Sequence, residues 1–276
     1  QSTFGGTSGE TQFVGDNPYD GAQIKYYMSK RHTFGKMTMK LYDSNDNFII
    51  SLTPGKKKGI NSVGWQFTGN TPIVATGKTL SFGGMVAARV AAGEYKVVIQ
   101  KGKEKFESTI KVEYMENSVF TLDERKKQQE VTTKLYNMTE ELAYMVYQID
   151  TYIEHAQKNA AATPKMSKSA TELNIALNGL KETLVITTGD NYVASAEEQL
   201  REKMGDIYST IAGYYGAPSL SQMENIAMIE AQMNQARKSF EELQNGVIKK
   251  YLASILTLEI AGPEIVTYKD FVNKDK

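Results

Sequence analysis

The sequence predicts a segregated α+β fold, in which an N-terminal immunoglobulin-like (Ig-like) β-sandwich is followed by an antiparallel helical bundle with two long and two short helices. Ahead of about Phe120, apolar residues recur at every second position, and Gly, Asn, Asp and Pro mark the turns. Beyond it, Gly becomes sparse and the apolar residues recur about every 3.5 residues. Strands gathered ahead of helices favour two separate parts over an alternating α/β fold.

These patterns divide the 276 residues into four expected segments. Residues 1–15 are rich in Ser, Thr and Gly, which indicates a linker remnant. The sandwich is expected at 16–117, the helical bundle at 118–262 and a C-terminal tail at 263–276. The chain begins with Gln1 and carries no apolar signal segment, so we interpret it as a processed form or an excised part of a larger protein.

About seven short strands are expected, a number typical of Ig-like domains of about 100 residues. Apolar and polar residues alternate in them, and the sequence Lys101-Gly102-Lys103 between the last two indicates a hairpin turn. Trp65 alternates with Val63 and Phe67 and is expected in the core. The expected strands are 23–28, 37–42, 48–52, 63–67, 79–82, 95–99 and 106–114.

Four capping boxes indicate four helix starts, because a Ser or Thr side chain and a Glu or Gln three residues later satisfy each other's backbone donors. The pairs are Thr121 with Glu124, Ser169 with Glu172, Ser195 with Glu198, and Ser219 with Gln222. The first and last helices carry heptad-spaced apolar residues over about 40 residues, which is about 60 Å. The middle helices, at 170–186 and 195–215, are about half as long and are separated by a turn at 189–191.

These lengths predict that the first helix leaves the sandwich, the second returns halfway, the third runs outward again and the fourth returns the whole way. The distal half would then be a four-helix bundle and the proximal half a two-helix stalk. Two helices alone leave apolar positions uncovered. The side chains expected to contact the sandwich, the tail or a partner are Val131, Leu135, Phe240, Val247 and Tyr251.

Composition argues against several classes of protein. Lys plus Arg and Asp plus Glu each total 32, so the chain has no net charge to attract nucleic acid, and no nucleic-acid partner is expected. No stretch approaches the ~20 apolar residues of a transmembrane helix, so no transmembrane segment is expected. The chain contains no Cys, which excludes disulfides and thiol catalysis.

No catalytic, cofactor-binding or metal-ligating residue is expected. His32 lies in an expected turn, and His155 follows Asp150 and Glu154 on a helix without a second ligand motif at a usable spacing. The stretch Asp43–Asn47 begins like a calcium loop but lacks its Gly and its bidentate Glu, which indicates a hairpin turn. The sequence has neither a nucleophile elbow nor a phosphate-binding loop.

Two surface features are compatible with ligand contact. Lys56, Lys57 and Lys58 form a basic run in a Gly-flanked loop, which is either simply solvated or contacts an anion or glycan. The 16 Tyr residues are numerous enough to form a sugar-binding face, since aromatic rings pack on the apolar face of a pyranose.

The order of several short motifs resembles the C-terminal module that follows the β-propeller in secreted proteins with BNR or sortilin-like repeats, often described as glycosyl-hydrolase-like. The sandwich motifs also resemble the Ig-like domain of flagellar hook-capping proteins. One departure is Ala92, where the family usually has Pro. The motifs are Asp16–Tyr27, Met37–Asp43, Gly59–Trp65, Phe82–Gly84, Arg89-Val90, Gly93–Tyr95, Leu122–Arg125 and Tyr215–Ser219.

The resemblance implies a non-catalytic accessory module of an extracytoplasmic bacterial protein, which packs on, orients or oligomerises the propeller domain of the same polypeptide. Any catalysis, such as glycoside hydrolysis, would belong to the propeller. A carbohydrate-binding module is the first alternative, and a second copy of the chain or a glycan are further possible partners. An enzyme with its site between sandwich and helices is the other alternative, and it requires a cluster of carboxylates or His there.

Overall fold

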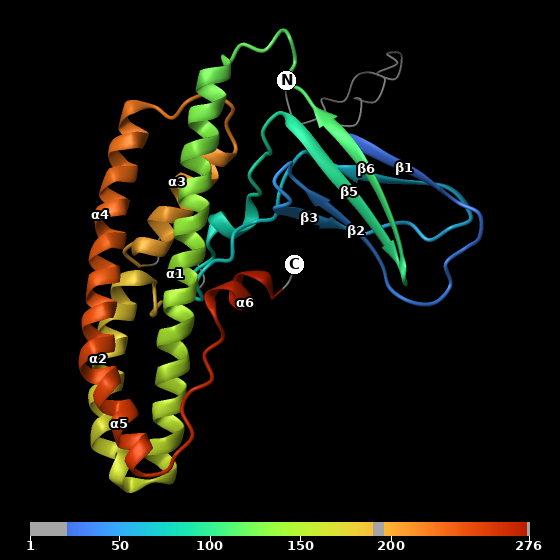
Figure 1. Cartoon of the computed structure of the whole chain (residues 1–276). Coiled ribbons are helices and arrows are strands. Elements are labelled where there is room, and N and C mark those ends of the chain that lie inside the picture. The colour runs from blue at the N-terminus through green and yellow to red at the C-terminus, as the bar shows by residue number, and fades with distance from the viewer. Residues whose placement is uncertain (1–20, 190–195, 275–276) are drawn as a thin grey trace, which may run out of the picture.

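A computed structural model describes residues 21–189 and 196–274 (Figure 1). Strands precede helices along the chain, as expected of an α+β protein. The strands are β1 (Ala22–Met28), β2 (Met37–Tyr42), β3 (Phe48–Leu52), β4 (Gly59–Trp65), β5 (Gly93–Lys101) and β6 (Glu104–Val112). The helices are α1 (Leu122–Ala162), α2 (Ser167–Leu184), α3 (Leu200–Ala212), α4 (Leu220–Leu243), α5 (Lys249–Thr257) and α6 (Tyr268–Asn273).

The strands form two antiparallel sheets that share one core. Strands β1 and β4 pair with each other, and the second sheet has the order β3-β2-β5-β6. Met39, Leu41, Tyr95 and Val97 of the four-stranded sheet pack in one cluster with Trp65 of β4, which belongs to the other sheet. Trp65 is 1% exposed, which confirms its predicted place in the core. We call these strands and their short loops the β unit.

The prediction of a strand at 79–82 is wrong. Residues 66–92 connect β4 to β5. Their two ends pair with each other beside the β core, through Thr68 and Arg89, and the stretch between them lies against the helices, with a 3₁₀ helix (η1, Phe82–Met85) in its middle (Figure 1). Backbone groups of this stretch bond to the helical part: the Lys78 amide donates to the Ile186 carbonyl at 2.9 Å. We call residues 66–92 the docking segment.

The two long helices begin as the sequence predicts. Capping boxes at Thr121 and Ser219 are confirmed, each with both reciprocal hydrogen bonds. Helix α1 has 41 residues. Helix α4 continues into α5 through a single π-helical turn, Gln244–Ile248, which adds a residue to the turn and brings both Val247 and Ile248 to the core side.

The starts of the two middle helices differ from the expectation. Helix α2 begins at Ser167, and the Ser169 hydroxyl bonds back to the Met166 carbonyl instead of forming a capping box. The predicted start at Ser195 lies outside the described residues, and α3 begins only at Leu200, where Gln199 provides no side-chain cap.

The expected outward run of the third helix is also wrong. Gln128 near the start of α1 donates to the Ile211 carbonyl near the end of α3, and Lys181 of α2 pairs with Asp150 of α1. Both short helices therefore run antiparallel to α1 and follow one another in series beside it (Figure 1). Along the half of α1 that faces α3, the docking segment supplies further cover: Ala75 is buried in the helical core, with Ile73 and Val86 packed against it.

The C-terminal tail returns along α1. The Tyr144 hydroxyl donates to the Val266 carbonyl at 2.9 Å, and Phe271 of α6 lies against Tyr144 and stacks on Tyr147. Helix α6 lies in the segment expected to be a tail without a helix. Among residues 21–189 and 196–274, no helix combines the length and apolar character needed to cross a membrane.

Candidate functional site

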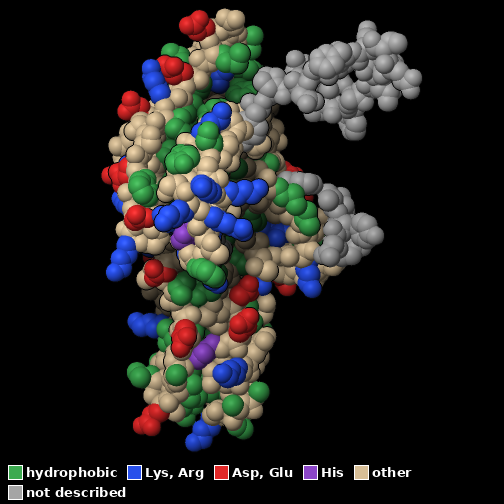
Figure 2. All heavy atoms as spheres, turned by 90° about the vertical axis from the view of Figure 1, so that its right-hand side faces the viewer, with side chains coloured by type: hydrophobic (Ala, Val, Ile, Leu, Met, Phe, Trp, Pro, Cys, Tyr) green, Lys and Arg blue, Asp and Glu red, His purple; other side chains and the backbone are tan. Residues whose placement is uncertain are grey.

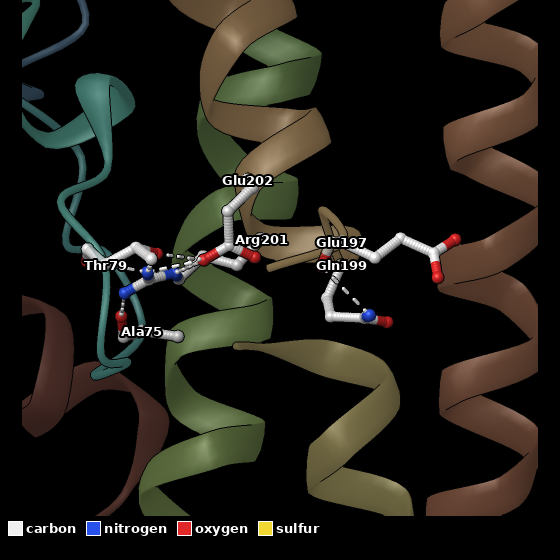
Figure 3. Close-up of polar contacts among 6 residues, drawn as sticks. All are labelled: Ala75, Thr79, Glu197, Gln199, Arg201 and Glu202. Atoms are coloured by element: carbon white, nitrogen blue, oxygen red, sulfur yellow. Dashed lines mark hydrogen bonds and ion pairs between the residues drawn. The ribbon is translucent and has the colours of Figure 1, made fainter. Parts of the chain in front are cut away.

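The β unit and the helices are held together by a buried ionic cluster (Figure 3). Arg201, at the start of α3, donates to the Ala75 carbonyl at 3.0 Å, the Thr79 carbonyl at 2.8 Å and the Glu202 carboxylate at 2.7 Å. The Thr79 hydroxyl donates to the same Glu202 oxygen at 2.9 Å. Arg201 and Glu202 are both buried, whereas Glu197 and Gln199 lie on the other side of this turn.

This cluster has the geometry of a structural tie. Buried charges are tolerated when they are paired and hydrogen-bonded, and the Arg201 guanidinium uses its donors on backbone carbonyls of the docking segment. Gly77 leaves room for it, because a Cβ there would lie 2.5 Å from the guanidinium carbon. Arg201 and Thr79 both donate to Oε1 of Glu202, whereas Oε2 is buried without a hydrogen-bond partner among the described residues.

A cleft of about 450 Å³ opens where the β unit, the start of α1 and the connection from α3 to α4 meet. We call it the junction cleft. Its lining is mainly apolar and aromatic, with two guanidinium groups and a few amides, the composition typical of binding sites. The lining residues that matter below are Phe67, Arg89, Tyr114, Phe120, Arg125 and Tyr215.

The Arg125 side chain lies among three aromatic rings of the junction cleft. Its guanidinium carbon lies 4.4 Å from the ring centroid of Tyr114, 5.4 Å from that of Tyr215 and 5.7 Å from that of Phe120. One guanidinium nitrogen donates to the Ser118 hydroxyl at 2.6 Å, while its Nε is buried without a hydrogen-bond partner among the described residues. Aromatic faces attract a cation electrostatically, so this cage fixes the Arg125 side chain.

A second arginine, Arg89, lies over the ring of Tyr215, which Arg125 also contacts. The guanidinium carbon of Arg89, in the docking segment, lies 4.9 Å from the ring centroid of Tyr215. Glu113 is the carboxylate of the cleft lining and is paired with Lys111 at 2.6 Å. Two guanidinium groups and one carboxylate therefore line the cleft.

Exposed apolar side chains surround the junction cleft. Val119 and Met115, both in the cleft lining, are 86% and 80% exposed. Tyr214 of the lining is also exposed, as is Leu122, the first residue of α1. Single exposed apolar residues are ordinary, but a group of them around one cleft marks an interaction site. We call Met115, Val119, Leu122 and Tyr214 the apolar rim.

The residues expected to form an interaction surface on the helices lie elsewhere. Val131, Leu135, Phe240 and Tyr251 are buried in the helical core, and Val247 is half-buried against it. They stabilise the contacts among the helices and with the docking segment, and they present no open surface. Lys56, Lys57 and Lys58 are exposed in the loop between β3 and β4, at the opposite end of the β unit from the junction cleft.

The other residues considered from sequence have structural partners. His155 Nδ1 lies 2.7 Å from the Tyr251 hydroxyl and Nε2 lies 2.8 Å from the Ala261 carbonyl, which ties α1, α5 and the tail together. Asp43 accepts hydrogen bonds from the backbone of Asn45 and Asn47, as the predicted hairpin turn requires. No group of three or more potential metal ligands occurs within the described part of the chain.

The junction cleft was missed because its parts are far apart in sequence. Two motifs noted for their resemblance, Leu122–Arg125 and Tyr215–Ser219, meet in it, but nothing in their sequences indicates that they are neighbours. Comparison of the chain with protein-family models, with curated proteins and with solved structures found no match.

Proposed function

We propose that this chain is a non-catalytic interaction module of a larger extracytoplasmic protein, and that the junction cleft holds a neighbouring domain of the same polypeptide in a fixed orientation. A β-propeller is the domain that the sequence motifs favour. The observation that carries the proposal is the apolar rim, which surrounds a preformed aromatic cleft with two guanidinium groups. Apolar anchors beside Arg and Tyr are the composition of protein–protein hot spots.

The cleft is better suited to a protein surface than to a sugar. Stacking on a pyranose requires a free aromatic face, but the Arg125 guanidinium lies over the rings of Tyr114 and Tyr215. Trp65, the one tryptophan, is buried and donates its indole N–H to the Thr68 carbonyl at 2.9 Å. These two observations favour a docking module over a carbohydrate-binding module.

The construction of the cleft favours an orienting role. Its walls come from the docking segment, from the end of β6 and the residues after it, from the start of α1 and from the connection between α3 and α4. The Arg201 cluster fixes the docking segment on α3. A domain seated there would contact the β unit and the helices together, and its angle would follow theirs. The start of β1 lies at the same end of the β unit, since Ala22 pairs with Trp65. A domain joined ahead of β1 is thus within reach of the cleft.

The Ig-like assignment of the β unit is part of this proposal. The order β3-β2-β5-β6 in one sheet and the pair β1–β4 in the other correspond to the C′-C-F-G and B-E strands of such sandwiches. Tyr95, near the start of β5, donates its hydroxyl to the Ala91 carbonyl at 2.7 Å. A tyrosine bonded to upstream backbone at this strand is the tyrosine corner of Ig-like domains.

The test is binding between this chain and the separately produced polypeptide that precedes it in the same protein, measured by calorimetry. We expect Val119→Glu and Met115→Glu each to weaken binding by about tenfold or more, because a charge is buried in an apolar contact. Ile175→Glu is the matched control, since Ile175 is 70% exposed on α2, away from the cleft. Sedimentation of the isolated chain accompanies each measurement.

Absence of binding, or equal affinity of the rim variants and the control, would contradict the proposal. Self-association of the isolated chain that Val119→Glu abolishes would identify a second copy, and not a propeller, as the occupant of the cleft.

A further inference from the structure

A second surface lies at the end of the β unit farthest from the helices. The loop 29–36, the loop 53–58 and the turn 102–103 all lie there, since Met28 pairs with Gly59 and Met37 pairs with Lys101. The three connections contain seven cations, Lys30, Arg31, Lys36, Lys56, Lys57, Lys58 and Lys103, and no Asp or Glu. We call this surface the basic end. Figure 2 looks onto this side of the molecule and shows Lys and Arg side chains gathered on the β unit.

No ion pair among residues 21–189 and 196–274 neutralises the charge of the basic end. Glu104 pairs with Lys101 and Glu107 pairs with Lys105, but none of the seven cations forms an ion pair with another described residue. The chain as a whole carries equal numbers of acidic and basic residues. The positive potential is therefore a local feature of this end, which the net charge of the chain conceals.

The loops of the basic end are held in place by buried hydrogen bonds. Asn61 is buried and bonds both the amide and the carbonyl of Lys57, and Tyr26 donates to the Gly55 carbonyl at 2.6 Å. The His32 amide donates to the Lys56 carbonyl at 3.0 Å, which joins the two loops. The lysines are thus presented from a fixed backbone, so binding at this end orders little additional chain.

Bulky apolar side chains protrude between these cations. Phe34, in the loop 29–36, is 87% exposed. Tyr27 and Ile60 are cross-strand partners at the last pairs of β1 and β4, and they are 69% and 77% exposed. Exposing an aromatic and an aliphatic side chain at the tip of a basic surface is unfavourable in water, and it is favourable where the tip meets the headgroup and acyl boundary of a bilayer.

We propose that the basic end binds the surface of an anionic lipid bilayer, with the lysines against the headgroups and Phe34, Tyr27 and Ile60 in the interfacial region. Basic clusters recognise anionic leaflets electrostatically, and apolar side chains beside them add insertion. A strand of nucleic acid or acidic polysaccharide would also attract the lysines. Such a polyanion would gain no favourable contact from the aliphatic Ile60. The basic and apolar side chains stand on projecting loops and strand ends, an arrangement that suits contact with a bilayer surface.

The proposal is tested by sedimenting the whole chain with vesicles. We expect binding to vesicles of equal parts phosphatidylcholine and phosphatidylglycerol, no binding to phosphatidylcholine alone, and release at high salt. Lys57→Glu with Lys58→Glu should weaken binding more than about tenfold, and Phe34→Ser about tenfold. Matched controls are Lys249→Glu with Lys250→Glu and Leu256→Ser on α5, whose side chains are exposed at the other end of the molecule.

A second measurement reports insertion directly. In Phe34→Trp, the emission of the new tryptophan should shift to the blue when anionic vesicles are added, while the buried Trp65 supplies a constant background. No binding to anionic vesicles overturns the proposal, as does binding that the loop variants and the controls affect equally. Binding of heparin or an oligonucleotide that Phe34→Ser leaves unchanged, without vesicle binding, would assign the basic end to a soluble polyanion and overturn the bilayer.

Discussion

The backbone of Gly83, in the docking segment, touches the backbone of Gly205 in α3. A Cβ on Gly83 would lie 2.9 Å from the Gly205 Cα, and a Cβ on Gly205 would lie 2.7 Å from the Ser81 hydroxyl and 3.2 Å from the Gly83 nitrogen. Both positions exclude any side chain as long as η1 stays on α3. This contact, with the Arg201 cluster next to it, fixes the β unit to the helices.

Gly205→Ala is therefore expected to destabilise the chain by about 1–3 kcal/mol, the usual cost of overpacking a close contact. The control is Gly179→Ala in α2, where nothing lies within 4 Å of an added Cβ. That change should stabilise the chain by up to about 1 kcal/mol, since Ala is the better helix former. Urea unfolding of both variants gives the comparison, and equal effects would show that the contact with η1 does not constrain Gly205.

Arg201→Met is expected to be more costly, about 3–5 kcal/mol, because it leaves Glu202 charged and buried without its partner. The double variant Arg201→Met with Glu202→Gln should recover part of this loss, since no unpaired charge remains. Thermal and urea unfolding of the two single variants and the double variant measure the coupling. Additive losses would mean that the two side chains do not stabilise each other.

The sequence correctly predicts the features of the fold that depend on local residue patterns. Alternation places Trp65 in the β core, and capping boxes locate Thr121 and Ser219 at helix starts. It does not predict where the docking segment goes, because the apolar residues near 79–82 fit an edge strand as well as a helical contact. Their destination depends on Arg201, more than 120 residues later, whose donors take the Ala75 and Thr79 carbonyls.

The direction of α3 escaped prediction for a similar reason. Helix lengths leave the choice between a returning and a continuing third helix open, and the choice is made by packing on the docking segment. The junction cleft depends on that same packing. Arg125 and Tyr215 are near each other only because α1 begins beside the end of α3.

Stability should fall steeply above pH 10. Burial raises the pKa of both Tyr95 and Tyr208 to about 12, against 10.0 for an exposed tyrosine. A raised folded-state pKa means that the unfolded chain loses these protons first. The stabilisation is complete below pH 10 and is lost between about pH 10 and 12, by about 1.4 kcal/mol per pH unit for each group. Tyr208→Phe should flatten this decline in urea unfolding measured across the interval, and an unchanged slope would contradict it.

The β unit and the helices should unfold together although each has a core of its own. Trp65, the single tryptophan, lies in the β core, so its fluorescence follows the β unit, while circular dichroism at helical wavelengths follows α1 to α5. The docking segment connects the two cores, because its ends belong to the β unit and Ala75 is buried among the helices. Coincident transitions by different probes are the mark of one cooperative unit.

We expect the two signals to give the same urea midpoint in the wild-type chain and in Gly179→Ala. In Gly205→Ala and Arg201→Met the docking segment is released more easily, so the fluorescence and dichroism midpoints should separate. The size of that separation measures how much of the cooperativity the docking segment transmits. Midpoints that already differ in the wild-type chain would mean that the β unit and the helices unfold independently, and a fixed orientation of a partner in the junction cleft would then lose its structural basis.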